Sequence, residues 1–305
     1  MKYLVTGGAG FIGTNLVIAL KNAGHEVKVV DNFSGGRKEE RIQKEVEYVE
    51  GDIRDFDLLL REMEGVDGVF HLAALPRVTY SVDHPQETHD VNVNGTLNVL
   101  LAARDRKVKR VVFSSSSSTY GDQPREMFPL KEDTVVKKPI APYALHKFIG
   151  EQYCRLFSEL YSLETVSLVY FNVYGPHVDP KGAYALVIGR FLEQVKNGEP
   201  MTVCGDGEYF RDYTHVSDVA RANILAMSSD SVGKGEMINI GNNNPHSVNE
   251  IVAMIGGKHV MVPPRPGDGR YFRADITKAK SLLNWEPTIT LEEGIAKLKK
   301  EWGIE

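Results

Sequence analysis

The chain opens with Met1-Lys-Tyr-Leu-Val-Thr-Gly7-Gly8-Ala9-Gly10-Phe11-Ile12-Gly13, an apolar run that leads directly into a glycine-rich turn and then a helix pattern. The run predicts a short buried strand. Glycines in such a turn let backbone N–H groups approach a pyrophosphate, which then lies at the N-terminus of the following helix. A strand, a glycine turn and a helix in this order predict a dinucleotide-binding βαβ unit.

A second apolar run supports this prediction. Glu26-Val-Lys-Val-Val30 ends at Asp31, roughly 20 residues after the last glycine of the turn. A carboxylate at this position can accept hydrogen bonds from an adenosine ribose, and it repels a 2′-phosphate. The sequence therefore predicts NAD, rather than NADP, as the dinucleotide.

The alternation of patterns continues through the first half of the chain. Apolar, β-branched runs predict strands at Val66–Leu72, Val108–Phe113 and Thr165–Tyr170, with helices near 14–23, 92–105 and 143–162. This rhythm predicts an α/β fold, a Rossmann-type doubly wound parallel sheet. Prolines and glycines become frequent after about Gly175, which indicates a smaller C-terminal α/β lobe that binds the substrate. We expect the dinucleotide-binding domain at 1–174 and the lobe mainly at 175–305, with a part near 212–243 returning to the first domain.

Composition excludes several other classes of protein. Of the 305 residues 42% are hydrophobic, and the formal net charge of −5 offers no general attraction to nucleic acid or to an anionic membrane. No apolar run approaches the ~20 residues that span a bilayer, and the N-terminus shows a strand pattern rather than a signal peptide. Cys154 and Cys204 form no zinc pattern, and His71 in its apolar strand is expected to be a core residue. We therefore expect a cytoplasmic protein without a metal site.

Tyr143-Ala-Leu-His-Lys147 places a phenol and an ammonium on one face of a helix. A free phenol has a pKa near ~10 and is not a base at neutral pH. A fixed positive charge nearby favours the phenolate and lowers that pKa, and an oxidised nicotinamide would lower it further. The pair therefore predicts a tyrosine that acts as a general base.

The run Ser114–Ser118 follows directly on the strand Val111-Val112-Phe113. Its composition alone is typical of a flexible polar loop. However, ligands of open α/β sheets bind at the carboxyl ends of strands, so a serine at this place can hydrogen-bond a substrate oxygen beside Tyr143. We favour this second interpretation.

These motifs in this order resemble the extended short-chain dehydrogenase/reductase superfamily, and the chain looks most similar to its nucleotide-sugar 4-epimerases, the group that contains UDP-galactose 4-epimerase. The resemblance implies catalytic roles for Ser116, Tyr143 and Lys147. It implies an NAD site made by Gly7, Gly10, Phe11, Ile12, Gly13, Asp31, Asn32, Ser34, Gly36, Asp52, Ile53, Leu72, Ala73, Ala74, Asn92, Ser114, Tyr143, Lys147 and Tyr170. It implies a UDP-sugar site made by Ser116, Asn172, Ala185, Leu186, Val203, Arg211, Arg265 and Phe272.

The reaction type follows from two positions after the expected catalytic serine. Dehydratases and decarboxylases of the superfamily carry acidic residues there, whereas this chain has Ser117 and Ser118. A serine of ordinary pKa cannot serve as that acid or base. The resemblance therefore implies a 4-epimerase that oxidises C4 transiently to a 4-keto sugar and returns hydride to the opposite face. The alternatives are a UDP-glucuronate 4-epimerase, another NAD-dependent sugar-nucleotide oxidoreductase, or a non-catalytic NAD-binding protein.

Two features bear on the sugar, and they point in different directions. The segment Asp179-Pro-Lys-Gly-Ala-Tyr-Ala185 resembles the branch that acts on UDP-N-acetylhexosamines. At the position that admits or excludes the N-acetyl group, this chain has Phe272, and a bulky ring there favours UDP-glucose and UDP-galactose. The resemblance also implies a homodimer formed through the helix of Tyr143, where Phe148, Ile149, Leu156 and Phe157 offer apolar side chains.

Overall fold

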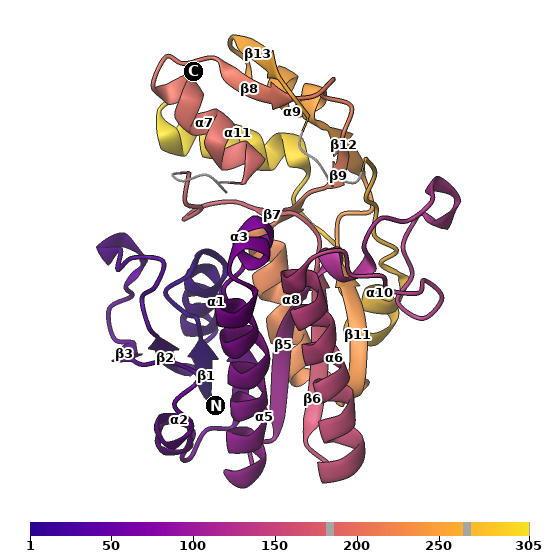
Figure 1. Cartoon of the computed structure of the whole chain (residues 1–305). Helices are drawn as coiled ribbons and strands as arrows, with labels where there is room; N and C mark the ends of the chain where they lie inside the picture. Colours follow the sequence, from indigo (N-terminus) through magenta and orange to yellow (C-terminus); the bar gives the residue numbers. More distant parts are fainter. Residues whose placement is uncertain (181–185, 265–269, 305) are drawn as a thin grey trace.

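The computed structural model describes residues 1–180, 186–264 and 270–304, and a parallel sheet of seven strands lies at its centre (Figure 1). The strands are β1 (Lys2–Thr6), β2 (Glu26–Asp31), β3 (Glu47–Glu50), β4 (Gly68–His71), β5 (Arg110–Ser116), β6 (Glu164–Tyr170) and β11 (Lys234–Ile240). Their order is β11-β6-β5-β4-β1-β2-β3, and the predicted Rossmann-type fold is confirmed. The order reverses between β1 and β4, where a doubly wound sheet binds its ligand.

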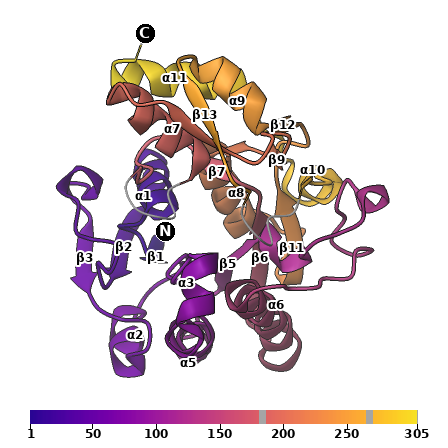
Figure 2. The same cartoon turned by 45° about the horizontal axis from the view of Figure 1, so that its top comes forward.

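Helices cover both faces of this sheet (Figure 2). One face carries α1 (Phe11–Asn22) and α8 (Val216–Ser228); the other carries α2 (Phe56–Glu62), α5 (Gly95–Asp105) and α6 (Pro142–Tyr161). Each face has its own apolar core, because parallel strands are buried on both sides. Phe157, expected on a dimer face, lies instead in one of these cores beside Cys154, since it points from α6 toward the sheet.

Strand and helix ends differ from the sequence prediction at several places, and two of these lie near the end of β5 and before α5. β5 continues to Ser116, three residues beyond the expected end, because Ser114–Ser116 pair with Leu168–Tyr170 of β6. A π turn at Asp90–Asn94 precedes α5, where one continuous helix was expected. The short strand β3, at the edge of the sheet, was not predicted.

The C-terminal lobe lies over the carboxyl ends of the strands (Figure 1). It contains α7 (Val187–Lys196), α9 (Val248–Ile255), α11 (Leu291–Trp302) and the paired strands β8 (Met201–Cys204) and β13 (His259–Val262), around a third apolar core. Between the lobe and the sheet lie β7 (Val173–Tyr174), β9 (Phe210–Asp212), β10 (Thr214–His215) and β12 (Pro245–Ser247). The remaining helices are α3 (Val78–Asp83), α4 (Pro85–His89) and α10 (Thr277–Leu283). Among the described helices, none has the length and apolar character to cross a membrane.

Candidate active site

The glycine turn between β1 and α1 leaves no room for side chains. A Cβ atom at Gly13 would collide with the carbonyl oxygen of Gly7, and one at Gly7 would lie 2.6 Å from the backbone nitrogen of Ala73. Gly7 also has a φ of +72°, which favours glycine. α1 starts behind Gly10, and no described side chain caps it. Its first N–H groups and the positive end of its dipole therefore suit an anion such as the pyrophosphate of NAD. Phe11 and Ile12, in the first turn of α1, are half-buried against the core.

Asp31 lies beside this turn, at the end of β2. Its Oδ2 accepts a hydrogen bond from the N–H of Ala9 at 2.9 Å, and its Oδ1 accepts one from the N–H of Phe33 at 2.8 Å. Burial raises the pKa of this carboxyl, and the two N–H donors offset part of the effect. Each oxygen keeps acceptor capacity for a ribose hydroxyl, so the residue suits NAD.

Asn32 and Asp52, both expected in the NAD site, form a hydrogen-bonded group with Arg54. The Asn32 amide donates to Oδ2 of Asp52 at 3.0 Å, and Arg54 forms an ion pair with the same carboxylate at 2.8 Å. Hydrogen bonds from Arg54 lower the pKa of Asp52 to about 2. Three more residues were expected in the NAD site nearby: Ile53, which is buried, and Ser34 and Gly36, which are exposed.

Asn92 holds the loop that follows β4. Its Nδ2 donates to the carbonyl oxygen of Leu75 at 3.1 Å, and its Oδ1 accepts from the N–H of Leu75 at 2.8 Å. This loop begins with Leu72, Ala73 and Ala74, which are half-buried beside the glycine turn. The structure thus gives the Asn92 side chain a role in positioning the loop.

Ser114 and Tyr170 use their side chains within the protein. Their hydroxyl oxygens are 3.0 Å apart, and Asn223 donates to the Tyr170 hydroxyl at 2.8 Å. The backbone carbonyl of Ser114 accepts a hydrogen bond from Nζ of Lys147 at 2.8 Å. Ser114 therefore contacts Lys147 through its backbone carbonyl, and not through its side chain.

Ser116, Tyr143 and Lys147 come together at the carboxyl end of β5. Tyr143 and Lys147 lie one turn apart on α6, and both are buried. The phenol of Tyr143 hydrogen-bonds with the side chain of Ser116. Ser116 Oγ in turn accepts from the Ser118 hydroxyl at 3.0 Å. The Ser116 proton is therefore available for the phenol oxygen or for a substrate oxygen.

Burial dominates the electrostatics of this group. It raises the pKa of Tyr143 to about 12, an effect that the hydrogen bond with Ser116 only partly offsets. It lowers the pKa of Lys147 to about 8, with Cys154 and Glu151 acting in the opposite direction. The pKa of Tyr143 is therefore raised where the sequence predicted a lowered one, because desolvation by burial is the largest effect on the phenol.

Among the residues expected at the substrate, Arg211 and Phe272 are in contact. The guanidinium carbon of Arg211 lies 5.1 Å from the centroid of the Phe272 ring, a cation–π arrangement. The N–H of Phe272 donates to the carbonyl of Phe210 at 3.1 Å, which joins its segment to β9. Asn172 follows β6, and its carbonyl oxygen accepts from the N–H of Thr214 at 3.2 Å.

Val203 and Leu186, also expected at the substrate, lie in or beside the elements of the C-terminal lobe. Val203 is fully buried in β8 and belongs to the core of the C-terminal lobe, because its strand alternates toward α7 and α9. Leu186 is exposed just before α7. Ala185 and Arg265 lie outside the described residues.

Sequence reasoning missed three residues around the catalytic group. Ser81 of α3 accepts a hydrogen bond from the N–H of Tyr143 at 3.0 Å, and nothing in its sequence context indicates this contact. Lys137 and Glu151 form a buried ion pair with an N–O distance of 2.7 Å. Helical spacing places Glu151 on the face of Lys147, and that signal was available in the sequence.

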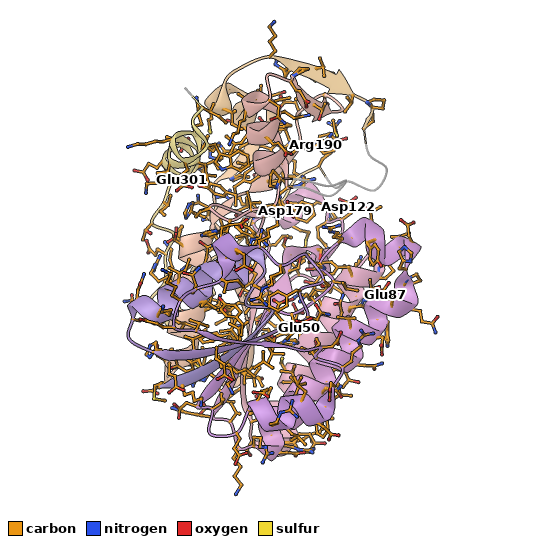
Figure 3. All side chains as sticks on the ribbon, turned by 90° about the vertical axis from the view of Figure 1, so that its left-hand side faces the viewer. Glu50, Glu87, Asp122, Asp179, Arg190 and Glu301 are labelled. Atoms are coloured by element: carbon orange, nitrogen blue, oxygen red, sulfur yellow. The ribbon has the colours of Figure 1, made fainter. Side chains whose placement is uncertain are left out.

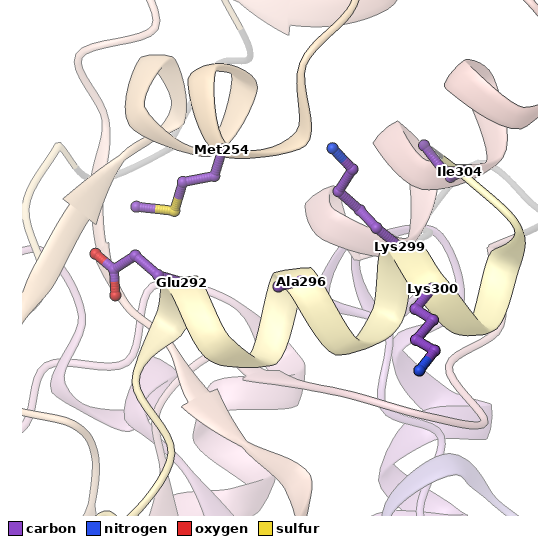
Figure 4. A pocket seen from close by; sticks show the side chains of 6 residues that line it. All are labelled: Met254, Glu292, Ala296, Lys299, Lys300 and Ile304. Carbon is purple, nitrogen blue, oxygen red and sulfur yellow. The ribbon is translucent and has the colours of Figure 1, made fainter.

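A hollow of about 450 Å³ lies elsewhere, between α9 and α11 of the C-terminal lobe (Figure 4). Its lining residues are Met254, Glu292, Ala296, Lys299, Lys300 and Ile304. None of these carries the chemistry found at the end of β5.

Within the described residues, no three or more His, Cys, Asp or Glu side chains are grouped to hold a metal ion. His71 is a satisfied core residue, as predicted, with Thr6 and Thr96 hydroxyls 2.7 and 2.9 Å from its ring nitrogens.

Known proteins share this sequence and architecture. A UDP-glucose 4-epimerase of Mycolicibacterium smegmatis is 40% identical over 310 residues, covering 97% of both chains. The crystal structure of the Thermotoga maritima UDP-glucose 4-epimerase with UDP-glucose matches with a TM-score of 0.93 and 40% identity, over 99% of this chain and 98% of that one. A UDP-N-acetylglucosamine 4-epimerase from Methanobrevibacter ruminantium matches with a TM-score of 0.92 and 35% identity, over 99% and 97%. The model of the NAD dependent epimerase/dehydratase family matches residues 3–241. The chain therefore belongs to the NAD-dependent epimerase/dehydratase family, with NAD as its cofactor.

Proposed function

We propose that this protein is a UDP-hexose 4-epimerase with UDP-glucose and UDP-galactose as its preferred pair of substrates. The observation that carries the proposal is the group of Ser116, Tyr143 and Lys147 at the end of β5, with serines at both following positions. Ser117 is buried, and Ser118 donates to Ser116. Neither can remove a carbon-bound proton, so the group supports transfer at C4 without elimination.

The proton chemistry belongs to Tyr143. NAD, when bound, supplies the hydride acceptor and donor at C4, and its oxidised nicotinamide adds the positive charge that ionisation of the phenol needs. Tyr143 takes the proton of the sugar 4-hydroxyl, and Ser116 donates a hydrogen bond to the same oxygen. Lys147, as an ammonium, keeps the phenolate charged. After the 4-keto sugar has presented its other face, Tyr143 returns the proton to O4 and the C4 epimer results.

The choice of sugar rests on Phe272. Its ring is half-buried and lies against the guanidinium of Arg211. A ring held in this way leaves less space for an acetamido group than a small residue would. Discrimination by the volume of a pocket is modest, about 10–200-fold, so we expect a preference rather than full exclusion of UDP-N-acetylglucosamine.

Three substrates test the proposal. We expect the purified protein to interconvert UDP-glucose and UDP-galactose without added NAD and without net NADH formation. UDP-N-acetylglucosamine should react with a kcat/KM lower by about 10-fold or more. Resolving the C4 epimers by chromatography gives the answer. Turnover of UDP-glucuronate alone would support the second candidate, a UDP-glucuronate 4-epimerase. Stoichiometric NADH would instead identify a net oxidoreductase.

We also propose that the protein forms a homodimer through α6. Leu145 and Leu160 are exposed on this helix, at 46% and 67%, and they share a face with the half-buried Ile149 and Leu156. An apolar stripe on a helix is typical of a subunit contact. Sedimentation equilibrium should give twice the 34.0 kDa mass of one chain, and Leu145→Asp with Leu160→Asp should give the monomer. A wild-type monomer at micromolar concentration would contradict this proposal.

A further inference from the structure

A buried ion pair lies directly behind the catalytic group. Nζ of Lys137 is 2.7 Å from both carboxylate oxygens of Glu151. The exposed fractions of the two side chains are 4% and 0%. Ser115 donates to the Glu151 carboxylate at 2.6 Å. The ammonium also lies 4.8 Å from the centroid of the Tyr120 ring.

Each partner of this pair connects to a catalytic residue. Glu151 follows Lys147 by one turn on α6, and Tyr143 by two. Ser115 immediately precedes Ser116 on β5. A buried ion pair is often no more stabilising than an apolar pair of similar volume, because both charges lose their hydration. Stability alone therefore does not account for a charged pair at this position.

The surroundings of Lys147 single out Glu151 as its charged neighbour. The titratable groups that face Lys147 are Tyr143, Glu151 and Cys154 on α6, and His71 on β4. Burial raises the pKa of the Cys154 thiol to about 12 and lowers the pKa of His71 to about 3, so both are neutral at pH 7. The Tyr143 phenol is neutral for the same reason. Among these described groups, Glu151 is left as the one that carries charge.

Lys137 and Glu151 have further neighbours of both signs. Glu132 acts on Lys137 as an anion, and Lys278 acts on it as a cation. Glu151 faces Tyr120, Cys154 and Lys147 besides its partner. Burial lowers the pKa of Lys137 and raises that of Glu151, while each partner opposes the change in the other. Each partner therefore favours the charged form of the other, and Lys147 also favours the ionised carboxylate of Glu151.

We propose that Glu151 and Lys137 are positioning residues that set the charge state of Lys147. Glu151 stabilises the Lys147 ammonium electrostatically. Lys137 weakens this effect, because its own positive charge partly neutralises the Glu151 carboxylate. This inference deepens the proposed function, in which the Lys147 ammonium keeps the phenolate charged. Because Lys147 lies close to Glu151 in a buried region, the coupling is little screened by solvent.

The two members of the pair should have opposite effects. Glu151→Gln keeps an acceptor for Ser115 but removes the anion, so the pKa of Lys147 should fall by about one pH unit. Lys137→Met removes the cation that competes for Glu151, so the pKa of Lys147 should rise. The double variant should lie between the two single variants. Lys137→Arg keeps the positive charge and should stay close to the wild type.

The measurement is a pH titration of lysine ammonium groups by NMR. The full chain, as purified, carries lysine labelled at Nζ with ¹⁵N, and the Lys147 resonance is assigned by its loss in Lys147→Met. Opposite shifts in the two single variants support the inference. Shifts in the same direction, or no shift in either, overturn it. Where Glu151→Gln does not fold, Lys137→Met alone decides: a rise supports the inference and its absence overturns it.

Activity provides a second readout. Because the reaction needs the Lys147 ammonium, kcat/KM should fall as pH rises through the pKa of Lys147. The pH at which kcat/KM falls should be lower in Glu151→Gln and higher in Lys137→Met than in the wild type, in parallel with the NMR result. A purely structural pair would lower activity at every pH without changing the pH at which kcat/KM falls. If the wild type does not epimerise UDP-sugars, the proposed function is wrong, but the NMR titration still tests the inference about Lys147. The failure of one is therefore distinguishable from the failure of the other.

Discussion

Tyr143 illustrates how burial and charge oppose each other in one side chain. Its pKa lies at about 12 against an ordinary value of 10.0, so ionisation costs about 3 kcal/mol more than in water. The hydrogen bond with Ser116 offsets only part of this cost. The phenol is consequently protonated in the protein at rest, and it becomes a base only when a further positive charge lies near it.

Removal of the Tyr143 hydroxyl should stop the reaction and leave the fold intact. In Tyr143→Phe we expect kcat to fall by about 10²–10⁴-fold or more, the usual contribution of a general acid or base. NAD content, measured by absorbance after denaturation, should match the wild type, because the glycine turn and Asp31 are unchanged. Near-normal epimerisation by this variant would show that the base is another residue.

His71 should make the stability of the protein depend on pH. Burial lowers its pKa from 6.5 to about 3, so the folded protein binds this proton less readily than the unfolded chain does. Its contribution is present above about pH 6.5 and is lost as pH falls toward 3, at up to about 1.4 kcal/mol per pH unit. In His71→Gln the side chain at this position does not titrate in this pH range. The difference in unfolding free energy between wild type and variant, from urea titrations at pH 7 and pH 5, should shrink at the lower pH; a constant difference would contradict the assignment.

Helix α6 receives its N-terminal cap from another helix. Ala141 occupies the cap position and no side chain at that position bonds to the helix. Instead, Ser81 of α3 accepts from the N–H of Tyr143, the second residue of α6. One hydroxyl thus satisfies a free donor of the helix and also fixes the backbone of the catalytic tyrosine.

Loss of this cap should affect stability and turnover together. We expect Ser81→Ala to lower the free energy of unfolding by about 0.5–2 kcal/mol, the usual range for a cap. A several-fold decrease in kcat/KM should accompany it, since Tyr143 is less well positioned. Ser228→Ala is a matched control, because that exposed hydroxyl bonds only to its own helix. Equal effects of the two variants, by thermal and kinetic assays, would remove the special role of Ser81.

The two parts of the molecule meet near the glycine turn between β1 and α1. Figure 3 places Asp179 at this junction, between the sheet near Glu50 and the lobe that carries Arg190 and Glu301. Lys38 forms an ion pair with Asp179 at 2.9 Å.

Arg41 makes a buried contact at this junction. Its guanidinium, buried between the two parts, donates to the carbonyl of His177 at 2.6 Å and approaches the carbonyl of Ala9 in the glycine turn. The segment after β7 is thereby tied to the same turn that suits the pyrophosphate.

This tie should slow the release of NAD. Arg41→Met keeps the length of the side chain but removes hydrogen bonds from a charged donor, which contribute about 1.5–3 kcal/mol each. We expect NAD to dissociate at least about tenfold faster, measured by transfer to an excess of a competing NAD-binding enzyme. Arg37→Met is the control, because Arg37 is exposed and pairs with Glu39 in the same loop. If both variants release NAD at the wild-type rate, the junction does not retain the cofactor.

Much of the fold was predictable because its signals are local. The glycine turn, the acid at the end of β2 and the alternation of apolar runs each depend on a few neighbouring residues, and together they predicted the doubly wound sheet. The serine run shows where local signals fail. Ser114–Ser116 have the composition of a loop, and only pairing with β6 makes them a strand.

The grouping of Tyr143 and Lys147 at the end of β5 was predictable for a similar reason, since helical spacing and the end of a strand are properties of the chain, and the resemblance added Ser116. Its charge state was not. The pKa values of Tyr143 and Lys147 depend on how far each group is removed from water, and segments distant in sequence decide that. Local motifs and the family resemblance thus indicated which residues meet, whereas packing of remote elements set the Lys137–Glu151 pair, the contacts of Arg41 and the buried position of Val203, because desolvation and hydrogen bonding are properties of the folded chain.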